Sequence, residues 1–161
     1  MKSKELSFSY EVYENENELR SEELLLLTRA RNATDHAYAP YSNFHVGAAA
    51  KLANGEIISG SNQENASFPV GICAERVLLS AASAVYPNIP VVSIAITYQS
   101  PSGENNGPVA PCGICRQTLH EYEIRNGQSI RLILSGMNGK VYIIPKAGEL
   151  LPLAFSGENL K

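Results

Sequence analysis

Three cysteines have the spacing of metal ligands. Cys112 and Cys115 are three residues apart, so on one helical turn their side chains point the same way. Thiolates at that spacing bind zinc, and Cys73 could supply a third sulfur from a separate segment. Three protein ligands leave one position of a tetrahedral site for water, as a catalytic zinc requires. The odd number of cysteines, without an export signal, also argues against a disulfide framework.

A carboxylate and two arginines accompany these cysteines. Glu75 follows Cys73 by two residues, so both can approach one metal only if the metal lies beyond the end of their helix. From there the carboxylate could take a proton from metal-bound water and pass it to a substrate. Arg76 and Arg116 add positive charge beside a site that three thiolates would leave negative, and we expect Arg76 to donate hydrogen bonds to the sulfurs.

Two other interpretations of the cysteines are open. Cys112 and Cys115 could form a redox dithiol, although the chain has no tryptophan and a third cysteine accompanies Glu75. A structural zinc would need a fourth ligand, which one of three histidines would have to supply: His36, His45 or His120. On a helix His120 would face away from Cys115, whereas His45 lies beside Phe44 and stays a candidate.

Both groups of cysteines are predicted to lie where helices begin. Apolar residues at helical spacing follow Cys73, and Pro87 ends that pattern. A further helix is predicted from about Cys112 to Asn126-Gly127, where glycine favours a helix end. Two helix N-termini directed at one point would stabilise thiolates and lower their pKa.

The remaining pattern predicts an α/β fold with a mixed sheet. Asn54-Gly55 lies between two apolar runs, which is a strong hairpin signal. A strand–helix–strand order after the hairpin favours parallel neighbours with helices packed on the sheet faces. We expect strands at 6–13, 44–53, 56–61, 91–98, 130–134 and 141–144, helices at 24–38 and near 147–151, and loops at 62–71 and 100–108.

Length and charge limit the classes of function. The 161 residues suit a single domain over 1–161. The net charge is −3 and the basic residues are scattered, so we expect no nucleic-acid partner. No apolar run is long enough to span a bilayer and no apolar signal core is visible, so we expect a cytoplasmic protein without membrane association. A small-molecule substrate fits this balance better.

Several ordered motifs resemble the small, zinc-dependent cytidine deaminases that act on free nucleosides. A Cys-x-Glu followed by Pro-Cys-x-x-Cys is the signature of the zinc deaminases. The resemblance extends from about Arg29 to Phe155, with residues 1–20 as an N-terminal extension. Its motifs are Ala39-Pro40-Tyr41-Ser42-Asn43-Phe44, Val46-Gly47-Ala48-Ala49, Asn62-Gln63-Glu64-Asn65-Ala66, Gly71-Ile72-Cys73-Ala74-Glu75-Arg76 and Pro111-Cys112-Gly113-Ile114-Cys115-Arg116-Gln117.

The resemblance implies a three-layer α/β/α fold with a mixed five-stranded sheet and a role for each matching residue. Cys73, Cys112 and Cys115 match the ligands of one Zn²⁺ per subunit, and Glu75 matches the general acid and base. The residues that match the substrate site are Phe44 as an aromatic wall, Asn62 and Glu64 at the ribose 3′-hydroxyl, and Ala74 and Ala110, whose backbone would read the pyrimidine edge. Phe155 resembles an aromatic residue that reaches a neighbouring subunit's site in the homotetrameric members.

The implied reaction is the hydrolytic deamination of cytidine and 2′-deoxycytidine, with water as co-substrate, in pyrimidine salvage. Two alternatives stay open: deamination of a related aminopyrimidine nucleoside such as blasticidin S, and a non-catalytic binding module with a structural zinc. The chain departs from the family pattern at Phe68, where some relatives carry tyrosine, and in the loop 100–108, which is enlarged.

Overall fold

A mixed sheet forms the centre of the molecule in a computed structural model that describes residues 1–101 and 103–160. Within those residues the sheet has six strands in the order β1-β6-β5-β4-β2-β3. The strands are β1 (Glu11–Tyr13), β2 (His45–Leu52), β3 (Ile57–Ser61), β4 (Val91–Gln99), β5 (Arg131–Ser135) and β6 (Val141–Ile144), and the helices are α1 (Ser21–Ala33), α2 (Ala74–Val85) and α3 (Gly113–Asn126).

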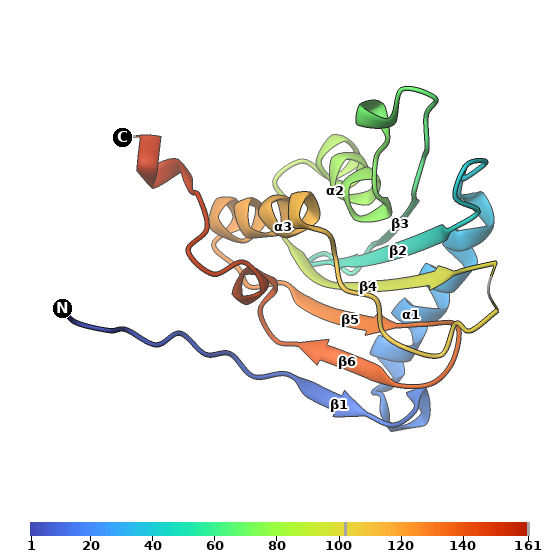
Figure 1. Ribbon diagram of the computed structural model, residues 1–161, viewed down its shortest axis with the longest axis horizontal. Helices are drawn as coiled ribbons and strands as arrows, with labels where there is room; N and C mark the ends of the chain where they lie inside the picture. Colours follow the sequence, from blue (N-terminus) through green and yellow to red (C-terminus); the bar gives the residue numbers. More distant parts are fainter. Residues whose placement is uncertain (102, 161) are drawn as a thin grey trace.

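The helices cover the two faces of the sheet unequally (Figure 1). On one face, Leu26 and Leu27 of α1 pack in a cluster with Ala49, Ala95 and other sheet residues. On the other face, α2 and α3 cover a larger apolar cluster. The expected three-layer α/β/α arrangement is therefore confirmed, and the candidate site lies on the face that α2 and α3 cover.

The strand directions follow from the connections. The strands β4 and β5 are parallel, and α3 lies in the connection between them, as the strand–helix–strand order predicts. The hairpin of β2 and β3 turns at Gly55, whose φ of +89° is accessible to glycine at little cost. Gly127 ends α3 in the left-handed conformation, also as predicted.

A glycine on β3 allows α2 to approach the sheet closely. A Cβ atom at Gly60 would lie 2.8 Å from the carbonyl oxygen of Ala74 and 2.7 Å from the amide nitrogen of Leu78. Any larger side chain would displace the beginning of α2. Because Ala74 directly follows Cys73, this contact fixes the position of one predicted metal ligand.

The N-terminal segment differs from the sequence-based expectation. The predicted strand at 6–13 is shorter, because only Glu11–Tyr13 pairs with β6. The partner strand ends at Ile144, and the following Pro145 has no N–H group with which to extend the pairing. This added edge strand makes the sheet six-stranded rather than five-stranded, and Arg131 anchors it through an ion pair with Glu11 (3.2 Å).

One further expectation is corrected and another agrees with the structure. The helix predicted at 24–38 begins at Ser21 and ends at Ala33, and a 3₁₀ turn, Thr34–His36, follows it. The described part of the loop 100–108, which leaves out residue 102, contains neither helix nor strand, as expected. Among the described helices, none has the length and apolar character needed to cross a membrane.

The buried Glu23 predicts a loss of stability in acid. Burial opposes ionisation of this carboxyl group, but hydrogen bonds from Arg20 and Arg131 outweigh burial and lower its pKa to about 2. The stabilisation is therefore complete above the unfolded pKa of about 4.5 and is lost as the pH falls towards 2. The free energy of unfolding, measured in urea, should be higher for the wild type than for Glu23→Gln above pH 4.5, and this difference should become smaller as the pH falls towards 2. A difference that stays constant would contradict the prediction.

Candidate active site

The three cysteine sulfurs lie together at the beginnings of α2 and α3. Cys73 is the N-cap of α2, Cys112 is the N-cap of α3, and Cys115 lies in the first turn of α3. The Sγ atom of Cys112 lies 3.8 Å from that of Cys73 and 3.5 Å from that of Cys115. Tetrahedral zinc with Zn–S bonds of about 2.3 Å requires sulfurs about 3.8 Å apart, so the thiols fit this metal.

The electrostatic environment of the sulfurs favours the thiolate form, which is the form that binds a metal. A hydrogen bond from Cys115 lowers the pKa of Cys73 to about 6, and the same bond together with burial raises the pKa of Cys115. The N-termini of both helices point their partial positive charge at the cluster, which stabilises thiolates. The predicted origin of the site at two helix beginnings therefore agrees with the geometry.

The described residues bring three possible metal ligands together and no fourth. In the described chain, one group of three or more possible metal ligands has all its ligand atoms within 4.8 Å of one another. Its members are Cys73, Cys112 and Cys115. His45 instead shares a hydrogen bond with Asn43 (3.1 Å). This geometry argues against a structural zinc closed by histidine, and all three cysteines are free thiols rather than a disulfide.

Glu75 is a buried carboxyl group beside the thiols. It lies in the first turn of α2 with 4% of its surface exposed, and it lines the same cavity as Cys73 and Cys112. Burial raises its pKa. A buried carboxyl group whose pKa lies above its usual value is suited to accept a proton and return it.

A cavity of about 540 Å³ connects the thiols with most of the predicted substrate residues. Phe44, Asn62, Glu64 and Ala110 line it together with Glu75. The lining also includes apolar residues that were not predicted as substrate contacts, among them Val46, Ile96 and Val109. Val46 on β2 and Ile96 on β4 lie on one face of the sheet, which the alternation of each strand indicates, but the sequence does not show that this face opens into a cavity.

Two of the predicted substrate residues do not line this cavity. The side chain of Ala74 is fully buried in the core cluster beneath α2. Phe155, on the C-terminal segment, is 58% exposed. Its backbone is held by a hydrogen bond that Gln117 Nε2 donates to the Phe155 carbonyl oxygen (2.9 Å). A contact of Phe155 with a neighbouring subunit stays a prediction.

Asn62 and Glu64 are held in place by hydrogen bonds with residues 41–46, which lie before and at the beginning of β2. Asn62 Nδ2 donates to the Phe44 carbonyl oxygen (2.9 Å), and Asn62 Oδ1 accepts from the Val46 amide (2.7 Å). The carboxylate of Glu64 accepts from the Ser42 hydroxyl and from the Tyr41 amide (2.9 Å), and these bonds lower its pKa. Each side chain keeps further hydrogen-bonding capacity for a ligand.

The two arginines near the thiols have different surroundings. In the described chain Arg76 makes no hydrogen bond to a sulfur, contrary to the expectation from the sequence. The pKa of Cys73 is lowered mainly by the hydrogen bond from Cys115, and the charge of Arg76 makes a smaller contribution in the same direction. Arg116 donates to the carbonyl oxygens of Pro111 (2.8 Å) and Leu150 (3.2 Å). Arg116 therefore fixes the backbone that precedes Cys112, which the sequence did not predict.

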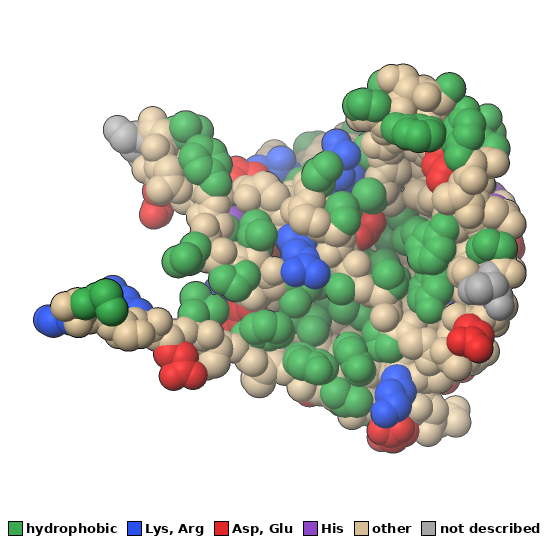
Figure 2. Space-filling view, in the orientation of Figure 1, with side chains coloured by type: hydrophobic (Ala, Val, Ile, Leu, Met, Phe, Trp, Pro, Cys, Tyr) green, Lys and Arg blue, Asp and Glu red, His purple; other side chains and the backbone are tan. Residues whose placement is uncertain are grey.

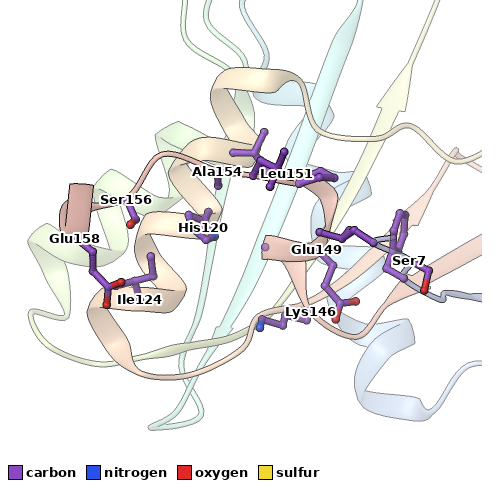
Figure 3. A pocket seen from close by; sticks show the side chains of 14 residues that line it. Ser7, His120, Ile124, Lys146, Glu149, Leu151, Ala154, Ser156 and Glu158 are labelled. Carbon is purple, nitrogen blue, oxygen red and sulfur yellow. The ribbon is translucent and has the colours of Figure 1, made fainter. Parts of the chain in front are cut away.

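A second cavity of similar size, about 520 Å³, lies away from the thiols. It lies between the two terminal segments, which project from the same end of the molecule with a hollow between them (Figure 2). His120 and Ile124 of α3 face this cavity, with Lys146 and Glu149 near Ser7 and Glu158 at the other end (Figure 3). The charged groups of both signs do not converge on one point, so the cavity beside the thiols is the better candidate.

Comparison with known proteins shows the family to which the chain is similar. The family model described as the cytidine and deoxycytidylate deaminase zinc-binding region matches residues 20–128. A cytidine deaminase from Halalkalibacterium halodurans is 37% identical over 84% of this chain and 96% of its own length. One from Sporosarcina psychrophila is 35% identical over 84% of this chain and 92% of its own length.

The fold comparison leads to the same family. The crystal structure of the cytidine deaminase from Burkholderia pseudomallei superposes with a TM-score of 0.70 and 40% identity, covering 81% of this chain and 97% of that one. The cytidine deaminase structure from Mycobacterium tuberculosis gives a TM-score of 0.63 at 29% identity. The chain, with its three thiols and buried carboxyl group at one cavity, belongs to the cytidine deaminase family.

Proposed function

We propose that this protein hydrolyses the exocyclic amino group of cytidine and 2′-deoxycytidine, yielding uridine or 2′-deoxyuridine and ammonia. The observation that supports this most is that Glu75 lines one cavity together with Phe44, Asn62 and two of the three clustered thiols, those of Cys73 and Cys112. The relatives named cytidine deaminase support the reaction class. A role in pyrimidine salvage follows from the same proposal.

The thiols of Cys73, Cys112 and Cys115 would hold one Zn²⁺ in each subunit. Bound zinc lowers the pKa of a coordinated water, so that a nucleophile is available at neutral pH. Glu75 would accept one proton of the attacking water and deliver it to N3 of the cytosine ring. It would then pass a second proton, from the new hydroxyl group at C4, to the leaving amine, so that the product keeps N3–H and ammonia leaves. The burial of Glu75 beside the thiols, in the lining of the cavity, supports this role.

Recognition of the nucleoside follows from the other lining residues. Asn62 and Glu64 offer an amide and a carboxylate that together can donate to and accept from a ribose 3′-hydroxyl. Phe44 provides an aromatic wall for the base. Backbone groups at Ala74 and Ala110 would read the polar edge of the pyrimidine, and the cavity holds a free nucleoside rather than a base within a polymer.

One sample can test the proposed reaction and its metal. Purified protein should decrease the ultraviolet absorbance of cytidine and contain one zinc per chain. Light scattering should give the mass of a homotetramer, the assembly in which Phe155 would reach a neighbouring site. Cytidine, 2′-deoxycytidine and blasticidin S are compared in competition, since a preference for blasticidin S would assign a different substrate. Stoichiometric zinc without any change in absorbance would contradict a catalytic role and favour a binding module.

A further inference from the structure

The aromatic wall of the cavity is one ring of a stacked pair. The rings of Phe44 and Tyr98 have centroids 5.1 Å apart and planes inclined by 17°. Tyr98 lies on β4 directly opposite Val46 on β2, so it shares a sheet face with Ile96 and Val46, which line the cavity. Tyr98 itself does not line the cavity and lies behind Phe44.

The backbone of Phe44 is fixed on both sides. The Phe44 amide donates to the Ser42 hydroxyl (3.0 Å), and its carbonyl oxygen accepts from Asn62 (2.9 Å). The remaining freedom of this residue is rotation of its side chain. A half-buried ring at the edge of a cavity can occupy several rotamers unless a neighbour excludes them. The stacked ring of Tyr98 is that neighbour.

Tyr98 is in turn supported by the enlarged loop. Its hydroxyl group donates to the Glu104 carbonyl oxygen (3.4 Å). The next residue, Asn105, accepts a hydrogen bond from the Asn138 amide (3.2 Å), and its carbonyl oxygen lies where a Cβ atom of Gly136 would be. The described part of the loop thus packs on the turn between β5 and β6.

We propose that Tyr98 is a positioning residue that holds the Phe44 ring in the orientation that binds the pyrimidine base, and so determines affinity for the substrate. The inference deepens the proposed function and depends on it. Tyr98 acts through Phe44 and takes no part in the proton transfers, which Glu75 carries out. Its effect therefore falls on binding of the substrate and not on the chemical step.

Kinetics of two Tyr98 variants test this role. Tyr98→Leu should raise KM for cytidine about three- to tenfold, since that is the range of an aromatic pair, with kcat changed less than about twofold. Inhibition by uridine, the product, should weaken by the same factor. Tyr98→Phe keeps the ring and loses a long hydrogen bond, so it should restore KM to within about twofold of the wild type.

A matched substitution separates positioning from loss of stability. Tyr142 on β6 also forms an aromatic pair, with Tyr10 at 5.0 Å, away from the cavity. Tyr142→Leu should leave KM and uridine inhibition unchanged, whatever it does to the melting temperature. An unchanged KM in Tyr98→Leu, an equal rise in Tyr142→Leu, or failure of Tyr98→Phe to restore KM would each overturn the inference. Absence of cytidine turnover in the wild type would instead overturn the proposed function.

Discussion

Replacing Glu75 with glutamine is expected to lower kcat for cytidine by at least about 10²- to 10⁴-fold while zinc remains bound. Glutamine has the shape of glutamate but cannot take up the proton of water or return it to the ring. The three thiols are untouched, so metal analysis should give the wild-type zinc content. Single-turnover kinetics and metal analysis on the same sample measure both quantities.

A second buried glutamate provides the control for this substitution. Glu123 on α3 is 6% exposed, and its carboxylate accepts from the amides of Ile130 (2.7 Å) and Gly148 (3.0 Å), outside the candidate site. Glu123→Gln makes the same chemical change in a buried position and should leave kcat within about twofold of the wild type after correction for the folded fraction. Wild-type kcat in Glu75→Gln would remove the proton-transfer role from Glu75.

The parts of the molecule that local patterns determine could be predicted from the sequence. Asn54-Gly55 and Gly127 mark a turn and a helix end through their own backbone preferences. Cys73 and Cys112 could be placed at helix beginnings because helical periodicity starts directly after each of them. The metal hypothesis also required the beginnings of the two helices to lie next to each other in space. The distance between the sulfurs of Cys73 and Cys112 meets this requirement.

The parts that depend on pairing between distant segments could not be predicted. The stacking of Tyr98 on Phe44 results from the register of β2 and β4, which places Tyr98 opposite Val46. Likewise, the length of β1 depends on where its partner strand meets Pro145. Neither position carries a local sequence signal, because register is set by the packing of the complete sheet.

The direction of charged side chains was also beyond the local pattern. Arg76 and Arg116 are both adjacent to site residues in the sequence, but Arg116 binds carbonyl oxygens of Pro111 and Leu150. Leu150 lies more than thirty residues after Arg116 in the sequence. The C-terminal segment is thereby linked to Pro111, the residue before Cys112, so the backbone at Leu150 is coupled to the thiol cluster without contacting it.

Replacing Cys112 with serine is expected to remove zinc binding and cytidine turnover without unfolding α3. Cys112 is the N-cap of this helix and makes no capping hydrogen bond through its side chain. Serine is among the preferred N-cap residues, so the substitution should preserve or strengthen the helix beginning. A serine hydroxyl is not a thiolate, however, and the metal would lose one of three protein ligands. Loss of an outer-shell partner already lowers metal affinity about 10- to 100-fold, and we expect loss of a direct ligand to cost more.

Competition with a chromogenic chelator measures this loss of zinc, and circular dichroism measures the helix content of the same sample. Ile114→Ser is the matched control, because it places serine two residues further along α3 at a side chain that is 63% exposed and leaves the thiols intact. The control should bind zinc like the wild type and regain activity when zinc is restored after chelation, whereas Cys112→Ser should not. If Cys112→Ser bound stoichiometric zinc with wild-type affinity, the cluster of three sulfurs could not be the metal site, because the metal would be held by groups that this substitution does not change.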